Sequence, residues 1–175
     1  LEQDLQDINE KQFPVLDTER EEQMRQYMEA AALEGDSVGG ILETVVTGIP
    51  AGIGEPWFDT MESCLAHGIF SIPAVKGIEF GKGFAFAGMK GSEANDAFEM
   101  QDGAVITKTN HNGGINGGIT NGMPIQFQTV IKPTPSIYKK QDTIDVAKQE
   151  NVTLQIEGRH DPAILHRARV VVDSI

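Results

Sequence analysis

The sequence predicts an α+β fold in which helices pack on an antiparallel sheet. Two observations carry this prediction: apolar residues recur at helical spacing in three segments, and β-rich runs bounded by Gly or Pro alternate with those segments. A chain of 175 residues is long enough to bury a core of its own. We therefore expect a single domain over residues 1–175.

The first predicted helix follows Thr18, which forms a capping-box pattern with Glu21. Apolar residues then recur at i, i+3, i+4 and i+7 across 24–31, and Gly35 is a typical helix stop. The preceding stretch shows no clear period. The pattern predicts an amphipathic helix with an acidic outer face.

Strand and helix alternate in the next part of the chain. The run GGILETVVTGIP (39–50) is β-rich and ends at a proline. Asp59 is placed to cap a helix that must end before Pro73, and AVKGIEF (74–80) has the composition of a short strand.

The second half has fewer helical signals. Residues 88–112 are predicted to form a long polar loop with weak helical signals near its start. MPIQFQTVI (123–131) and NVTLQI (151–156) are predicted strands. The last helix is expected to have Asp161 as its N-cap and Pro162 at its first position, because these residue types favour those places.

The stretch NHNGGINGGITNG (110–122) contains five glycines, which lose more backbone entropy on folding than any other residue. The cluster has three possible reasons: a series of tight turns, a flexible linker, or backbone that lies against a ligand. A dinucleotide fingerprint is excluded, because that motif opens a helix whereas this run leads into a predicted strand.

Composition limits the classes of function. A net charge of −12 argues against a nucleic-acid or anionic-membrane surface, and no apolar run is long enough for a membrane span. The single cysteine, Cys64, excludes an internal disulfide and suits a reducing compartment, so we expect a soluble cytoplasmic protein with Cys64 as a buried filler. No motif for zinc hydrolysis, serine acyl transfer or P-loop phosphate binding is present, and no metal site is predicted.

Basic residues gather late in the chain, between Lys132 and Arg169. This cluster favours either a binding site for a small anion or a solvated charged face.

Four separated segments, in this order, are more specific than any one of them: GDSVGG (35–40), GIPAGIGEPWFD (48–59), NHNGGINGGITNGMPI (110–125) and GRHDP (158–162). Together with SIPAVKGIEFGKGF and IKPTPSI between them, they resemble chorismate synthase over nearly the whole chain. Family members also carry a GESHG-type segment and an arginine- and serine-rich segment, which do not occur here. The sequence is therefore expected to be a core fragment that is inactive by itself.

The resemblance implies a β-α-β sandwich-type core and an enzyme, a carbon-oxygen lyase. The reaction would be the anti 1,4-elimination of phosphate from 5-enolpyruvylshikimate 3-phosphate, with reduced FMN as cofactor and no net oxidation. It further implies a place in the shikimate pathway, an association with NADP and a homotetramer.

The resemblance also assigns residues. Family flavin contacts match Pro73, Ala74, Gly117, the run Lys132, Pro133, Thr134, Pro135 and Ser136, and Arg159. The family residue linked to proton transfer near flavin N5 matches Asp161, where a capping role can coexist. For Lys132 and Arg159 the alternative is surface solubility. None of the four histidines, His67, His111, His160 and His166, is assigned to catalysis.

Three hypotheses follow from these assignments. The chain belongs to a flavin-dependent phosphate lyase, or it is a folded assembly core without activity of its own, or it is a non-catalytic anion- or flavin-binding module.

Overall fold

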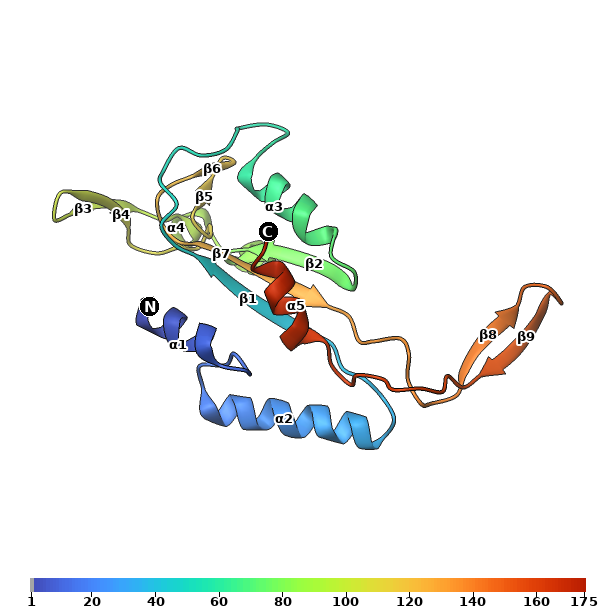
Figure 1. Cartoon of the computed structure of the whole chain (residues 1–175). Helices are drawn as coiled ribbons and strands as arrows, with labels where there is room; N and C mark the ends of the chain where they lie inside the picture. The colour runs from blue at the N-terminus through green and yellow to red at the C-terminus, as the bar shows by residue number, and fades with distance from the viewer. Residues whose placement is uncertain (1) are drawn as a thin grey trace. The chain divides into compact units, whose positions relative to one another are not determined.

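The computed structural model describes residues 2–175 (Figure 1). The chain divides into two compact units, and each is considered by itself. The first unit joins Leu1–Gly40 to Lys132–Val170, and the second joins Ile41–Ile131 to Val171–Ile175. The single domain over residues 1–175 stays a prediction.

The first unit contains two helices near the start of the chain and a hairpin and helix near its end. Its elements are α1 (Glu2–Glu10), α2 (Thr18–Leu33), β8 (Gln141–Asp145), β9 (Glu150–Leu154) and most of α5 (Leu165–Val172). Arg169 of α5 donates a hydrogen bond of 2.7 Å to the side-chain oxygen of Asn9 at the end of α1. This contact ties the two ends of the unit together.

The second unit contains a three-stranded sheet in the order β1-β7-β2. Its elements are β1 (Gly40–Val46, whose first residue belongs to the first unit), α3 (Met61–Phe70), β2 (Val75–Phe80), a 3-10 helix η1 (Gly83–Gly88), α4 (Gly91–Ala94), β3 (Phe98–Gln101), β4 (Ala104–Thr107), β5 (Ile115–Asn116), β6 (Ile119–Thr120) and β7 (Ile125–Ile131). β2 and β7 are antiparallel, with a register shift between Val75 and Gly77.

The core of the second unit lies against the central strand, β7. Side chains alternate along a strand, and Ile125, Phe127, Thr129 and Ile131 on one face of β7 are all buried. Helix α3 packs against β2 and contributes Ile69, which is fully buried. Helices and antiparallel strands together confirm the α+β class.

Helix starts differ from the sequence predictions by one residue in two places. The N-cap of α2 is Asp17 rather than Thr18, because Asp17 Oδ1 accepts hydrogen bonds from the backbone of Glu19 and Arg20. The N-cap of α3 is Thr60 rather than Asp59, and its hydroxyl accepts from Ser63 N. In both cases a neighbouring residue supplies the capping oxygen.

The long polar loop predicted for 88–112 is wrong where β3 and β4 form a hairpin, whereas the short helix α4 lies where weak helical signals were expected, near the start of the segment. Asp102 and Gly103 form the turn, with φ of 50° and 82°. Two consecutive positive φ angles are those of a type I′ turn, whose twist matches that of a hairpin.

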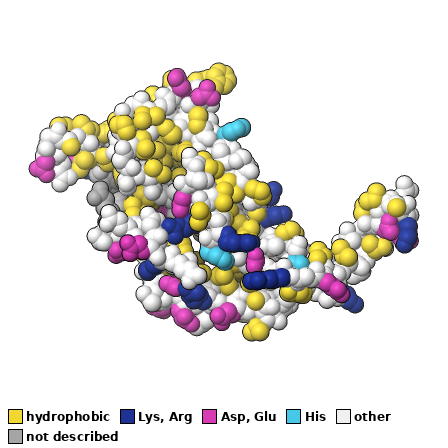
Figure 2. Space-filling model, in the orientation of Figure 1, with side chains coloured by type: hydrophobic (Ala, Val, Ile, Leu, Met, Phe, Trp, Pro, Cys, Tyr) yellow, Lys and Arg dark blue, Asp and Glu magenta, His cyan; other side chains and the backbone are white. Residues whose placement is uncertain are grey.

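Large apolar side chains also lie on the surface, as the yellow areas in Figure 2 show. Leu33, Phe58 and Phe84 are each more than 80% exposed. Among residues 2–175, no helix has the length and apolar character needed to cross a membrane.

Candidate functional site

The glycine-rich segment is a set of tight turns. β5 and β6 form a two-stranded antiparallel hairpin, and Gly117 and Gly118 make its turn with φ of 60° and 87°. Gly113, Gly114 and Gly122 also have positive φ. Each of the five glycines therefore adopts a backbone conformation that other residues rarely take. The flexible-linker alternative is wrong.

Most of these glycines also lie against other backbone. A Cβ atom on Gly113 would come within 2.6 Å of Gln126 O, and one on Gly118 would lie 2.4 Å from Glu55 O. Gly117 differs, because nothing lies within 4 Å of the position of its missing Cβ. The turn thus presents one open glycine, next to one that is tightly packed.

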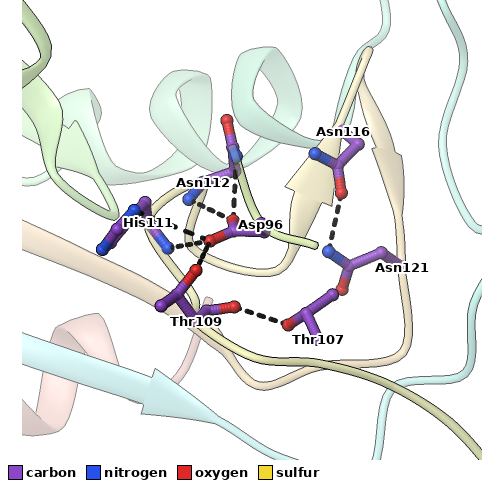
Figure 3. Close-up of polar contacts among 7 residues, drawn as sticks. All are labelled: Asp96, Thr107, Thr109, His111, Asn112, Asn116 and Asn121. Atoms are coloured by element: carbon purple, nitrogen blue, oxygen red, sulfur yellow. Dashed lines mark hydrogen bonds and ion pairs between the residues drawn. The ribbon is translucent and has the colours of Figure 1, made fainter. Parts of the chain in front are cut away.

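A buried carboxylate anchors the entrance to this segment (Figure 3). The Asp96 side chain is 1% exposed, and its two oxygens accept four hydrogen bonds. Oδ1 accepts from Thr109 Oγ1 and from His111 N, both at 2.7 Å. Oδ2 accepts from Asn112 N and from Asn112 Nδ2, both at 2.8 Å.

These donors decide the charge state of Asp96. Burial by itself would raise the pKa of the carboxyl group, because it penalises the charged form. The hydrogen bonds from Asn112, Thr109 and His111 outweigh that effect and leave the pKa of Asp96 below its ordinary value. The carboxylate is therefore ionised at neutral pH. His111 Nδ1 lies 3.9 Å from Asp96 Oδ1.

A second buried polar residue, Thr120, anchors the exit of the segment. Its hydroxyl donates to Pro50 O at 2.7 Å and accepts from Ile53 N at 3.0 Å. Its backbone also exchanges hydrogen bonds with Gly52 and Ile53. The two ends of the glycine-rich hairpin are thus held by different parts of the second unit.

Pro73 and Ala74 lie in the turn between α3 and β2, away from Gly117. The start of α3 lies beside the glycine turn, because Met61 N donates to Gly118 O at 2.9 Å. The helix has 10 residues, which corresponds to a length of about 15 Å. The two groups of predicted flavin contacts in this unit therefore lie at opposite ends of α3. Ala74 has a φ of 75°, a strained conformation for a residue with a side chain.

The other predicted contacts belong to the first unit, where one short segment joins them. Ser37 Oγ donates to Thr134 O at 2.6 Å, and Val38 N donates to Pro162 O at 2.8 Å. The KPTPS run and the GRHDP run thus both bond to the GDSVGG segment. Tyr138 and His160 add a ring contact, with centroids 4.8 Å apart.

Several polar groups of this cluster have no hydrogen-bond or ion-pair partner among the described residues. No hydrogen bond or ion pair joins Lys132 or Arg159 to another residue in the described part of the chain, and both are exposed. Thr134 Oγ1 is buried and has no partner among the described residues. A buried hydroxyl without a partner is costly, so a ligand oxygen at this position would relieve the penalty.

Asp161 does not cap a helix, so that prediction is wrong. α5 begins at Leu165, four residues later. The carboxylate of Asp161 instead accepts a hydrogen bond of 2.5 Å from Arg167 Nη2. Pro162 and the residues after it form an irregular turn, which moves the helix start away from the Asp-Pro pair. Cys64, expected to be a buried filler, is also exposed.

A hollow of about 310 Å³ in the first unit contains none of the predicted site residues. Phe13, Arg25 and His166 are among its lining residues. The Arg25 guanidinium lies 4.3 Å from the Phe13 ring centroid and forms an ion pair with Glu21, which neutralises its charge. Across residues 2–175, no cluster of three or more His, Cys, Asp or Glu side chains is placed to hold a metal ion.

Comparison with known proteins assigns the family. The sequence profile described as chorismate synthase matches residues 2–175. The chorismate synthase of Thermococcus kodakarensis is 50% identical over 153 residues, which are 87% of this chain and 43% of that protein. The chorismate synthase of Methanosarcina mazei is 45% identical over 175 residues, which are 100% of this chain and 48% of that protein.

A solved structure described as "Crystal Structure of Chorismate Synthase" has a TM-score of 0.69 and 31% identity, and the match covers 75% of this chain and 40% of that chain. This chain therefore spans less than half the length of these relatives. The resemblance drawn from the four sequence segments is confirmed: the chain belongs to the chorismate synthase family.

Proposed function

We propose that this chain is part of a chorismate synthase, which eliminates phosphate from 5-enolpyruvylshikimate 3-phosphate to give chorismate and requires reduced FMN. The observation that carries the proposal is the family match over residues 2–175, which includes every segment to which flavin contacts were assigned. The chain spans less than half the length of these relatives, so the proposal concerns the activity of the whole enzyme to which this chain belongs.

The residues present fit a flavin phosphate. Lys132 and Arg159 offer cationic groups that no described residue neutralises, and Thr134 Oγ1 is a buried hydroxyl that needs a partner. Charge-assisted hydrogen bonds from such groups are the usual means of holding a phosphate. Pro133 and Pro135 fix the backbone on both sides of Thr134. We propose that these residues and Ser136 hold the phosphate or ribityl chain of FMN.

The second unit is proposed to supply backbone contacts. Gly117 is open on the side where a side chain would stand, so a flat ring could approach its peptide groups. Pro73 and Ala74 would contact the flavin at the other end of α3. The strained backbone of Ala74 supports this role, since strain of this kind gathers at functional sites.

The proposed chemistry uses the bound flavin and one carboxylate of this chain. When bound, FMN supplies electron density that helps phosphate leave, with no net oxidation. Asp161 is proposed to accept or return a proton near the flavin. Its Oδ2 bonds to Arg167, and no described donor bonds to Oδ1, so that oxygen is available for a proton. Arg167 orients the carboxylate.

Flavin titration tests the proposed site. FMN fluorescence is expected to change on addition of the chain, and Gly117→Val should weaken binding by at least about tenfold, because its side chain occupies ligand space. Gly103→Val is the matched control: Gly103 has a φ of 82° and nothing within 4 Å, but it lies at the tip of the β3–β4 hairpin. Equal loss of affinity in both variants would contradict the proposal.

Turnover tests the activity. Chorismate formation would be measured anaerobically with reduced FMN, for this chain and for the Thermococcus kodakarensis protein side by side. FMN binding without turnover would favour the assembly-core alternative. Binding of inorganic phosphate without any change in FMN fluorescence would favour the non-catalytic anion-binding module, an alternative that the unpaired Lys132 and Arg159 support equally well.

We further propose a cytoplasmic homotetramer and an association with NADP, as the family implies. Exposed apolar side chains support self-association, since large apolar patches usually mark interfaces. Sedimentation of the purified protein would give the oligomeric state.

A further inference from the structure

Buried polar side chains are scarce in the described part of the chain, and two of them serve the same hairpin. Among residues 2–175 the buried polar or charged residues are Asp96, Thr120 and Thr129. Asp96 holds the entrance of the glycine-rich segment, and Thr120 holds its exit. Burial of a carboxylate is costly unless its oxygens are fully hydrogen-bonded. Asp96 and Thr120 therefore fix the backbone at the two ends of the glycine-rich segment.

Asp96 acts on the backbone directly. Two of its four donors are the successive backbone N–H groups of His111 and Asn112, so one carboxylate sets the direction of the chain there. The constraint continues into the hairpin, because Gly113 N donates to Asn110 O at 3.1 Å and Ile115 N donates to Asn112 O at 3.4 Å. Ile115 begins β5.

The same turn is fixed to the rest of the second unit. His111 O accepts from Lys82 N at 2.7 Å, and Asn110 Nδ2 donates to Pro124 O at 2.9 Å. Gly81 packs closely against the same turn, because a Cβ atom there would lie 1.9 Å from His111 O. A shift of the Asn110–Gly113 turn would therefore be transmitted to β5 rather than absorbed locally.

We propose that Asp96 is a positioning residue for flavin binding: it holds the Asn110–Gly113 turn so that the open glycine at 117 stands in one fixed place. Asp96 itself does not touch the ligand. This inference rests on the proposed function, in which Gly117 lies against FMN. Without the carboxylate the hairpin samples other positions, and the apparent affinity for FMN falls by the fraction of time spent in the competent one.

The test compares three variants with the parent chain. Asp96→Asn leaves an amide group facing two N–H donors. Thr109→Val removes one donor at an exposed position with little change of shape, which provides a milder variant if Asp96→Asn folds poorly. Val172→Ala is a core control, because Val172 is 4% exposed and belongs to the second unit but lies outside the hairpin and its anchors. FMN affinity, thermal midpoint and amide hydrogen exchange would be measured for all four proteins.

We expect the dissociation constant for FMN to rise about tenfold in Asp96→Asn and about threefold in Thr109→Val, but less than twofold in Val172→Ala at a comparable loss of thermal midpoint. Amide exchange should speed up selectively over residues 111–122 in the first two variants. The inference is overturned if the core control weakens FMN binding as much as Asp96→Asn does. It is also overturned if both anchor variants bind FMN like the parent. A parent chain that does not bind FMN would instead overturn the proposed function, and this inference with it.

Discussion

Replacement of Asp96 by Asn should destabilise the second unit strongly. The carboxylate accepts four hydrogen bonds, and an asparagine can accept only the two that reach its oxygen. Two donors would then face an amide group. Hydrogen bonds to a charged group contribute about 1.5 to 3 kcal/mol each. The lower cost of burying a neutral side chain offsets part of this loss.

We therefore expect the free energy of unfolding to fall by about 3 kcal/mol, which corresponds to a decrease of about 6 to 12 °C in the thermal midpoint of a chain this size. Circular dichroism would follow the thermal transition. Asp102→Asn is the matched control: Asp102 is exposed at a hairpin turn, where Asn is equally well tolerated, and its effect should stay within about 0.5 kcal/mol. A loss below about 1 kcal/mol for Asp96→Asn would refute the reasoning.

The stability difference between the parent chain and Asp96→Asn should depend on pH. The pKa of Asp96 is lowered from 3.8 in the folded chain, so its ionised form stabilises the fold. That contribution is fully present above 3.8 and is lost as the pH falls through the lower folded-state pKa. The difference in stability between the parent and Asp96→Asn should therefore be constant near neutral pH and shrink under acid conditions. A difference that grows on acidification would contradict the sign.

Three further changes test other parts of the structure. Gly118→Ala should cost about 3 kcal/mol in a thermal melt, because its Cβ would lie 2.4 Å from a backbone oxygen at a φ of 87°; a neutral result would contradict the packing of the turn. Asp161→Asn should change stability by less than about 1 kcal/mol, since an exposed ion pair contributes little. In a full-length enzyme of the family that contains this segment, the proposed proton-transfer role predicts an anaerobic turnover about 100-fold lower; a rate within about threefold of the parent would leave no such role. Lys139→Met should raise the pKa of Asp36 towards its ordinary value, because the Lys139 side chain is the main hydrogen-bond donor that lowers it; an unchanged NMR titration of Asp36 would exclude that cause.

Strands with strong alternation could be predicted from the sequence. The run 123–131 alternates apolar and polar residues, and the observed β7 spans Ile125–Ile131. Residues 74–80 gave the position of β2 from their composition rather than from alternation. Periodicity decides such elements because one face must be buried, and burial depends on the pattern more than on any single residue.

Helix ends and the β3–β4 hairpin were harder to predict. Asp17 and Thr18 both have a side chain that can cap, as do Asp59 and Thr60, so residue type alone does not choose between the two neighbours. The Asp102-Gly103 pair is a strong local signal for a hairpin turn. The two strands that it joins are short and largely exposed, so no buried face gives them a periodic pattern.

Asp96 could not be found from the sequence. It follows an asparagine in an ordinary polar stretch, and its donors lie 13 to 16 residues further along the chain. Only folding brings them together, since the return of the β3–β4 hairpin places Thr109, His111 and Asn112 beside the carboxylate. The family resemblance does not point to it either, because the matched residues are ligand contacts, whereas Asp96 is proposed to hold such a contact in place without touching the ligand.

The turn at Gly117 combines free space at the glycine with buried anchors on either side of the segment. A glycine turn has no side chain to hold it in place, so its position must come from the chain on either side. Asp96 supplies that constraint at one end and Thr120 at the other, while the neighbouring Gly118 packs closely against the backbone of Glu55. If the turn served only to reverse the chain, a residue that tolerates a positive φ, such as Asn, could replace Gly117, because no atom lies near the position of its side chain. Open space together with buried anchors is the arrangement expected where a ligand meets backbone at a fixed position, which is the role proposed for Gly117.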